Sequence, residues 1–173
     1  MLFDSKSQVY ELKNKMNESA ERTYDKLKLM MESSTPLEIL FQMKFNKIGF
    51  DPVDGDELNI IEQINQLFSD LVVMAALEEL FDIYPSKKFE THMGAEAGFD
   101  IESTDGEVVA ECFAVTTAAS NGKLKKDSEK LINKASKQKK YIYFYSQNDI
   151  DEKLERIYEK FPEINYRRIK NIS

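Results

Sequence analysis

The sequence has one cysteine, one histidine, no tryptophan and only six glycines among its 173 residues. A single cysteine, Cys112, excludes an intramolecular disulfide and favours a reduced, intracellular setting. With His92 as its only histidine partner, it cannot form the clustered ligands of a zinc site. No glycine-rich phosphate-binding loop is present, so no motif indicates an ATP or dinucleotide site.

Long apolar runs and an excess of basic charge are also missing. Residues 1–10 lack the basic and apolar segments of a signal peptide, and no uninterrupted apolar stretch of 18 residues occurs, so we expect a cytoplasmic protein. The formal net charge is −7, which excludes a globally basic nucleic-acid binder. A local basic groove is still compatible with that charge, because association depends on the charges that face the ligand.

The apolar residues, 42% of the chain, are enough for the core of one domain of ordinary size with a small helical appendage. We predict a helical region over residues 1–57 and a core domain over 58–173. A long helix is expected from about Asp4 to Glu32, with a narrow apolar seam. Such a seam is typical either of a dimerisation arm or of a helix that packs on its own chain. The seam residues are Val9, Leu12, Met16, Ala20, Thr23, Leu27 and Met30.

Further along, the pattern changes from helical periodicity to short strand-like runs. Asp105-Gly106 lies between two of these runs and predicts a tight hairpin turn. The fold class is therefore α/β (α+β), with a small mixed central sheet flanked by helices. The predicted helices are Leu37–Lys47, Leu58–Asp82, Lys123–Ser136 and Asp149–Lys160, and the predicted strands are Lys88–Thr91, Gly98–Ser103, Glu107–Val115 and Tyr141–Tyr145.

Two carboxylates flank the hairpin at matched distances from its turn. Asp100 is five residues before Asp105, and Glu111 is five residues after Gly106, so the two come roughly opposite each other across the ladder. Opposed like charges repel, which indicates a bound cation. Two carboxylates suit Mg²⁺ (or Mn²⁺), which keeps several waters and meets a phosphate.

This arrangement resembles the PD-(D/E)XK nuclease superfamily, whose fold is restriction-endonuclease-like. The resemblance covers roughly residues 58–160 and rests on the order of elements, on Gly98-Phe99-Asp100-Ile101, on the strand with Glu111 and on the Asn-Gly-Lys-Leu-Lys-Lys-Asp segment after it. It implies that Asp100 and Glu111 hold Mg²⁺, and that the protein is a DNA endonuclease in a restriction or defence context. It also implies a homodimer, because cutting both strands requires two active sites.

In that family a lysine two residues after the second acidic residue orients or activates the attacking water. The corresponding position here is Phe113, which cannot take this role. Some members of the family supply the cation from the following helix, and Lys125 or Lys126 is expected to take this role here. A third acidic residue is expected from the preceding helix, where we favour Glu62 over Gln63, Gln66 and Asp70. A glutamate near a helix N-terminus is also favoured there by the helix dipole alone.

A basic segment follows the hairpin. Residues 123–140 contain eight lysines and two acidic residues, a net charge of +6. Such a stripe indicates contact with a phosphate backbone or, alternatively, a solvated helix face. The lysines expected to bind nucleic acid are Lys123, Lys125, Lys126 and Lys130.

The remaining candidates are weaker. His92 is expected either to contact a phosphate or act as a base, or to be incidental, and Cys112 to be a small buried residue. The sequence thus predicts a metal-dependent phosphodiesterase acting on DNA. The alternatives are a catalytically inactive module of the same fold that binds nucleic acid or a protein, and an interaction protein built around the N-terminal helix.

Overall fold

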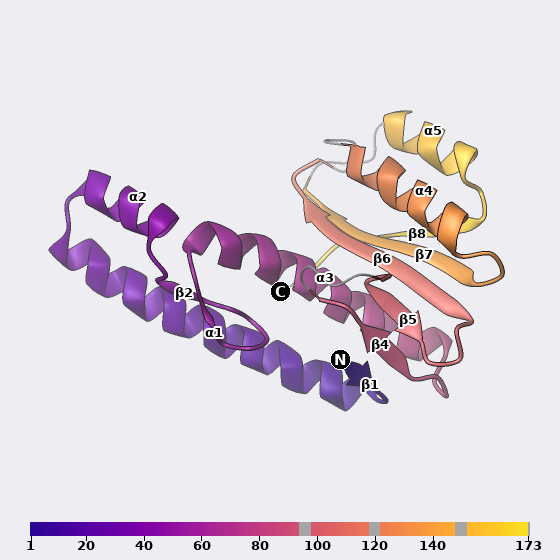
Figure 1. Cartoon of the computed structure of the whole chain (residues 1–173), viewed down its shortest axis with the longest axis horizontal. Coiled ribbons are helices and arrows are strands. Elements are labelled where there is room, and N and C mark those ends of the chain that lie inside the picture. Colours follow the sequence, from indigo (N-terminus) through magenta and orange to yellow (C-terminus); the bar gives the residue numbers. More distant parts are fainter. Residues whose placement is uncertain (94–97, 118–121, 148–151, 173) are drawn as a thin grey trace. The chain divides into compact units, whose positions relative to one another are not determined.

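The computed structural model describes residues 1–93, 98–117, 122–147 and 152–172. The fold is mixed α/β, as predicted, with helices flanking a mixed sheet (Figure 1). The helices are α1 (Lys6–Ser33), α2 (Pro36–Phe45), α3 (Ile60–Ile83), α4 (Lys123–Lys134) and α5 (Glu152–Lys160). The strands are β1 (Leu2–Phe3), β2 (Gly49–Phe50), β3 (Glu57–Leu58), β4 (Phe89–Thr91), β5 (Ile101–Ser103), β6 (Val108–Val115), β7 (Lys139–Ser146) and β8 (Ile164–Ile169).

The predicted helices and strands are present, with shifted ends. The predicted start of α5, at Asp149, lies outside the described residues. The sequence analysis missed β1, β2, β3 and β8. The first three have only two residues each, too few for a periodic pattern, and β8 carries Arg167 and Arg168 on the edge of the sheet.

The chain divides into two compact units, Met1–Val9 with Ser69–Ser173, and Tyr10–Phe68. These bounds differ from the predicted division between residues 57 and 58. One reason is that β1 pairs with β4, which places the first residues of the chain in the larger unit. The other is that α3 contributes residues 60–68 to the smaller unit and residues 69–83 to the larger.

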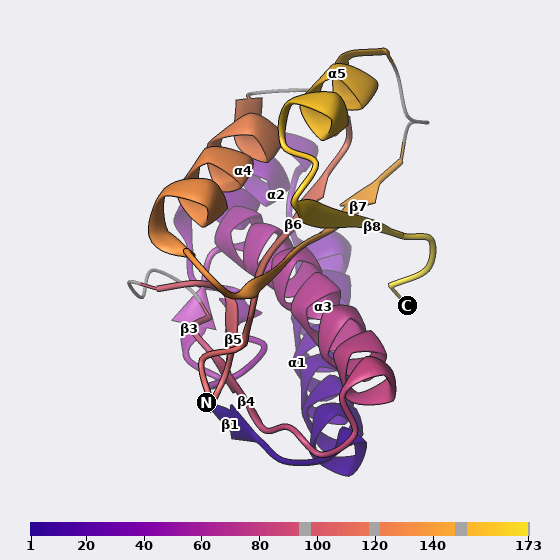
Figure 2. The ribbon, with the colours of Figure 1, turned by 90° about the vertical axis from the view of Figure 1, so that its right-hand side faces the viewer.

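The larger unit contains a six-stranded sheet in the order β1-β4-β5-β6-β7-β8. Strands β4, β5 and β6 form an antiparallel meander, while β7 and β8 continue it in parallel. Parallel neighbours need a crossover connection, and α4 and α5 provide the two crossovers. Figures 1 and 2 show these helices on one face of the sheet and the second half of α3 on the other.

Alternation along β6 decides which side chains meet α4. Val109 and Phe113 join the core cluster under α4 and α5, and Glu111 lies between them in the alternation. The intervening residues, including Cys112, are buried on the opposite face, as predicted for Cys112. The sheet therefore presents one buried carboxylate to the α4 side.

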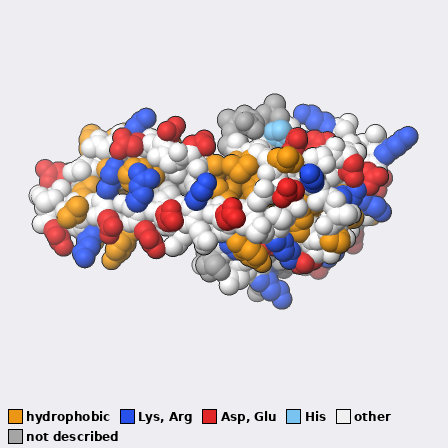
Figure 3. Space-filling view, turned by 90° about the horizontal axis from the view of Figure 1, so that it is seen from below, with side chains coloured by type: hydrophobic (Ala, Val, Ile, Leu, Met, Phe, Trp, Pro, Cys, Tyr) orange, Lys and Arg blue, Asp and Glu red, His pale blue; other side chains and the backbone are white. Residues whose placement is uncertain are grey.

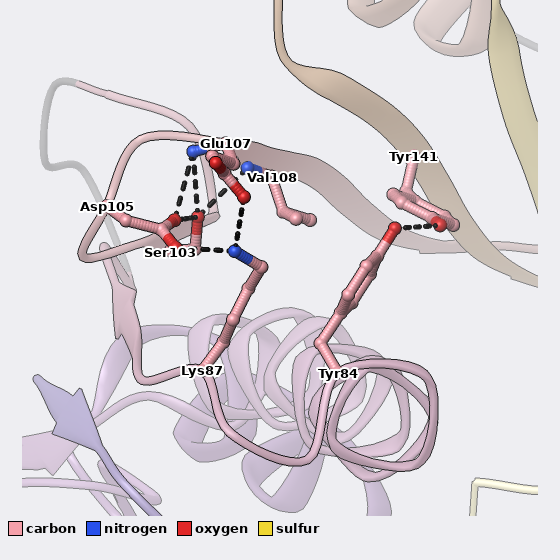
Figure 4. Close-up of polar contacts among 7 residues, drawn as sticks. All are labelled: Tyr84, Lys87, Ser103, Asp105, Glu107, Val108 and Tyr141. Carbon is pink, nitrogen blue, oxygen red and sulfur yellow. Dashed lines mark hydrogen bonds and ion pairs between the residues drawn. The ribbon is translucent and has the colours of Figure 1, made fainter.

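The hairpin between β5 and β6 is held by a polar network (Figure 4). The ammonium of Lys87 forms ion pairs with Asp105 and Glu107. The hydroxyl of Ser103 donates to Asp105 Oδ1 at 2.7 Å and accepts the Val108 N–H at 2.9 Å. The Lys87 ion pair lowers the pKa of Asp105 to about 2. These contacts fix the turn and hence the register of the two strands.

The smaller unit is built on α1. Its predicted seam is largely buried, at Leu12, Met16, Thr23 and Met30, which supports packing within the chain over a dimerisation arm. The ribbon of β2 and β3 is tied to α1, because the Ser19 hydroxyl donates to the Phe50 carbonyl at 3.0 Å. The face in Figure 3 carries side chains of both charge signs interspersed with hydrophobic ones.

Helix α3 is long and apolar enough to cross a membrane by length and mean hydropathy, a test that core helices also pass. In the described structure 44% of its most apolar 18-residue window is buried in the protein. Its second half carries Val72, Met74, Leu77 and Leu80, each fully buried. This burial is what the sequence predicts for a helix packed on a sheet.

Candidate metal and phosphate site

Asp100 and Glu111 are brought together by the hairpin. Ile101 pairs with Ala110, so the same register places the preceding residue, Asp100, opposite Glu111. The backbone N–H of Cys112 donates to Asp100 Oδ2 at 2.6 Å, which holds this carboxylate against β6. The predicted juxtaposition across the hairpin is therefore present.

Both carboxylates are withdrawn from water, and this changes their acidity. Only 1% of Glu111 is exposed. Burial, reinforced by the negative charge of Asp100, raises the pKa of Glu111 to about 7, against the opposing effect of Lys130. Burial also raises the pKa of Asp100, although the Cys112 N–H and nearby lysines oppose this shift. The site therefore stores unfavourable negative charge that a cation would relieve.

Helix α4 supplies cations to these carboxylates. The Nζ of Lys130 lies 2.6 Å from Glu111 Oε1. Two turns earlier, Lys123 Nζ lies 3.0 Å from Asp127 Oδ1. Lys123, Asp127 and Lys130 share one face of the helix because they are spaced by four and three residues. Two lysines and a third carboxylate thus line the side of the pair that faces α4.

Asp127 was not predicted, and it is 5% exposed. Burial raises the pKa of Asp127, against the attraction of Lys123. Burial lowers the pKa of Lys123, but the Asp127 carboxylate outweighs this and the net pKa is raised. The second oxygen of Asp127, Oδ2, accepts no hydrogen bond from any residue that the structure describes.

Two aromatic rings form apolar walls beside the lysines. Lys130 Nζ lies 5.6 Å from the centroid of the Phe99 ring, and Lys123 Nζ lies 5.9 Å from that of Phe113. Phe113 itself is buried and stacks on Phe144, with ring centroids 5.7 Å apart. The position that carries the lysine in PD-(D/E)XK nucleases is therefore part of the hydrophobic core here.

His92 directly follows β4 and lies next to Asp100. Its backbone N–H donates to the Asp100 carbonyl at 3.1 Å. A charge on its imidazole lowers the pKa of Asp100. The single histidine therefore borders the carboxylate pair.

The structure does not bring Lys125 or Lys126 to the carboxylates. Both are exposed, and Lys125 instead lies 3.8 Å from Glu129 on its own helix. Lys125 is two positions after Lys123 and therefore lies on another side of the helix. Lys126 is three positions after Lys123, at the edge of the same face, but its side chain is exposed. The lysine that lies next to Glu111 could have been found in the sequence, because Lys123, Asp127 and Lys130 follow helical spacing beside buried Leu124 and Leu131.

Glu62 has a local structural role in the smaller unit. Its backbone N–H donates to Asn59 Oδ1 at 2.9 Å, and its carboxylate accepts the Asn59 N–H at 3.3 Å. These reciprocal bonds cap the N-terminus of α3, and the side chain is exposed. The structure therefore supports the helix-terminus interpretation of Glu62.

The basic segment is less uniform than its composition predicts. Lys140 is buried, with its Nζ 3.4 Å from Glu163. Lys130 and Lys123 pair with buried carboxylates, while Lys125 and Lys126 remain at the surface of α4. The part of the segment available to an anionic ligand consists of its exposed lysines, which are Lys125, Lys126, Lys134, Lys137 and Lys139.

Within the described residues, no three histidine, cysteine or acidic side chains are placed to hold one metal ion together. The protein can thus offer the two carboxylates of the hairpin, with the other positions left to water or a phosphate. No protein-family model, curated protein or solved structure significantly matches this chain.

Proposed function

We propose that this protein is a metal-dependent phosphodiesterase that cleaves DNA, with Asp100 and Glu111 as ligands of Mg²⁺ or Mn²⁺ and Lys130 as the lysine of the site. The observation that carries the proposal is the 2.6 Å approach of Lys130 to Glu111, beside Asp100. The order of α3, the β4-β5-β6 meander, α4 and parallel β7 supports the proposal, because it follows the order on which the resemblance to PD-(D/E)XK nucleases rests.

The donor set fits a hard divalent cation. Carboxylate oxygens are the ligands that Mg²⁺ prefers, and Mg²⁺ commonly uses one or two of them together with substrate phosphate. Burial and the nearby charge of Asp100 raise the pKa of Glu111 even with Lys130 in place, and a bound cation would favour its charged form. When bound, the metal would activate water and stabilise charge on the leaving oxygen.

Other residues at the site would have separate roles in binding the metal and the substrate phosphate. The Cys112 N–H fixes the orientation of Asp100, and Glu111 must lose its proton before it can act as a ligand. Lys130 would turn from Glu111 toward a substrate phosphate and stabilise the charge that develops there. Lys123, held by Asp127, would keep the α4 side of the site positive.

Exposed lysines on α4 support DNA as the substrate class. Lys125 and Lys126 would contact the phosphate backbone, and each contact would release counterions. A basic patch on an acidic protein gives local attraction without general affinity for polyanions. We expect DNA binding to weaken steeply as salt increases.

A second candidate is an inactive module of the same fold that binds nucleic acid or a partner protein. The observation that favours it is Phe113, which occupies the family's lysine position and is packed in the core. Under this alternative the Lys130–Glu111 pair would be a permanent ion pair, and the protein would bind no metal.

A cleavage assay with matched lysine variants tests the proposal. Purified protein would be incubated with plasmid and linear DNA in Mg²⁺ or Mn²⁺, comparing Lys130→Ala with Lys125→Ala. We expect Lys130→Ala to slow cleavage by roughly 10²- to 10³-fold, the usual cost of losing one group that stabilises transition-state charge. Lys125→Ala should weaken DNA binding and leave the cleavage rate of bound DNA unchanged.

Fold integrity of Lys130→Ala would be checked by circular dichroism, with Lys130→Gln as a second variant. Equal activity of Lys130→Ala and Lys125→Ala, or cleavage that survives Asp100→Asn in a clean preparation, would refute the assignment. Absence of cleavage together with absence of metal binding would favour the inactive module.

A further inference from the structure

Helix α2 presents an apolar stripe to solvent. Leu37, Leu40, Phe41 and Phe45 are 78%, 64%, 58% and 62% exposed, and no residue of α2 is buried. Their spacing of three, four and eight residues from Leu37 puts them along one side of the helix. Isolated exposed apolar residues are ordinary, but a continuous stripe of four large ones marks a contact surface.

The helix that carries this stripe is well formed within the smaller unit. Pro36 occupies its first turn, and Thr35 and Glu38 form a capping box at its N-terminus. Phe41 and Phe45 touch each other, with ring centroids 4.9 Å apart. The partly covered side chains, Ile39, Gln42 and Met43, lie between the exposed positions in the sequence. The stripe thus belongs to an ordered helix whose outer side is uncovered.

We propose that α2 is the interface of a homodimer, in which the α2 helices of two copies pack antiparallel about a two-fold axis at Phe41. The sequence of α2 is self-complementary about this residue. An antiparallel pair centred there places Phe41 against its own copy and Leu37 against Phe45 of the second chain. The same register sets Glu38 opposite Lys44, and two-fold symmetry creates that ion pair twice.

The exposed area of the α2 stripe is compatible with a second copy of the chain as its partner. With about 150 to 250 Å² per large side chain, the four residues expose on the order of 500 Å². A standard interface takes about 800 Å² from each partner, so the stripe supplies most of a dimer interface and its polar rim can supply the rest. The α1 seam cannot serve instead, because it is largely buried within the chain.

The proposal does not rest on nuclease activity. A dimer through α2 would exist without metal or DNA, and its test uses neither. It gives the expected homodimer a specific surface, and it moves that surface from the seam of α1 to the outer side of α2.

Light scattering after size-exclusion chromatography, and sedimentation equilibrium, would measure the mass of the full chain at several concentrations. We expect the wild type to be a dimer and Phe41→Glu to be a monomer, with the dimer dissociation constant raised at least about 100-fold, the effect of losing a central anchor. Tyr24→Glu is the matched control, because Tyr24 is an aromatic residue of α1 that is 65% exposed. It should remain a dimer.

The ion pair is tested separately. Lys44→Glu should weaken the dimer about tenfold, since it opposes Glu38 to a like charge. Adding Glu38→Gln should restore affinity, because glutamine keeps the capping box and removes the repulsion.

Three results would overturn the proposal. They are a wild type that is still monomeric at 100 µM, about a hundred times a dissociation constant of 1 µM, a dimer that Phe41→Glu does not affect, and an assembly larger than a dimer. Flotation with vesicles of phosphatidylcholine and phosphatidylglycerol tests whether a membrane surface, and not a second copy, covers the stripe. Binding of the monomeric wild type to vesicles, lost in Phe41→Glu, would assign the stripe to a membrane instead.

Discussion

The fold changes the acidity of Glu111, whose pKa is raised to about 7. It is a carboxylate on a central strand, with apolar neighbours on both sides and a second carboxylate across the hairpin. The ammonium of Lys130, on α4, lies against the buried oxygen of Glu111 and offsets part of the free energy that burial of a charge costs. Removing water raises the energy of the charged form of Glu111, and a bound cation would offset this cost.

The raised pKa of Glu111 predicts how stability depends on pH. The folded pKa, about 7, exceeds the ordinary value of 4.5, so the folded state holds this proton more tightly than the unfolded state. The stabilisation is therefore complete below about pH 4.5 and is lost as pH rises through about 7. Its size is up to about 3 kcal/mol for one group. Urea unfolding at pH 5, 6, 7 and 8 would measure the decline.

Glu111→Gln is the variant that isolates this group, because it cannot titrate. Its free energy of unfolding should change less between pH 5 and 8 than that of the wild type, and should exceed the wild-type value at pH 8. Asp100 and Asp127 also have raised pKa values and would leave a smaller slope. Identical slopes for the two proteins would show that Glu111 ionises normally.

At the scale of elements, the site depends on the register of one hairpin and on one face of one helix. The hairpin turn sets Asp100 against Glu111, and α4 aligns Lys123, Asp127 and Lys130 beside them. Gly106 in the turn has a φ of 69°, in the left-handed region that favours glycine.

Gly106→Ala should lower stability by about 1 kcal/mol, because an added Cβ strains the left-handed backbone while meeting no atom within 4 Å. Gly106→Asn should cost less, since asparagine tolerates this conformation. Denaturant midpoints of the three proteins test the order. Equal stability of the alanine and asparagine variants would mean that backbone strain is not the cause.

The sequence was sufficient for the helices, for strands β4 to β7 and for the carboxylate pair, because apolar periodicity and the Asp-Gly turn are local signals. It was insufficient for the lysine. Choosing Lys130 over Lys125 or Lys126 requires knowing which side of α4 faces the sheet, and this was indicated only by Leu124 and Leu131. Strand β1 was not predictable, since its two residues form a strand only by pairing with β4, far along the chain.

At the scale of the whole molecule, the first residues of the chain pair with a strand far along the sequence and form one unit with residues 69–173. Phe3 pairs with Phe89, and the backbone N–H of Thr91 donates to the Met1 carbonyl at 2.8 Å. Deleting residues 1–34 would therefore remove an edge strand of the sheet together with α1. Such a deletion cannot by itself distinguish an interaction arm from a structural part of the core.

Point substitutions in β1 separate these roles. Phe3→Ala should cost about 3 to 5 kcal/mol, because Phe3 is 1% exposed and its loss leaves a cavity. Leu2→Ala, one residue away and half exposed, should be within about 0.5 kcal/mol of the wild type. Thermal unfolding would compare the two, and similar losses would show that β1 is not packed as described.

Calorimetric titration of Mn²⁺ tests the central claim most directly, because it needs no knowledge of the substrate. The proteins to compare are the wild type, Asp100→Ala and, as a carboxylate control, Glu62→Ala. The account predicts saturable binding that is lost in Asp100→Ala, retained in Glu62→Ala, and tighter at pH 8 than at pH 6 as Glu111 loses its proton. Binding that persists unchanged in Asp100→Ala, or a wild type that binds no Mn²⁺ even with a DNA oligonucleotide present, would contradict it.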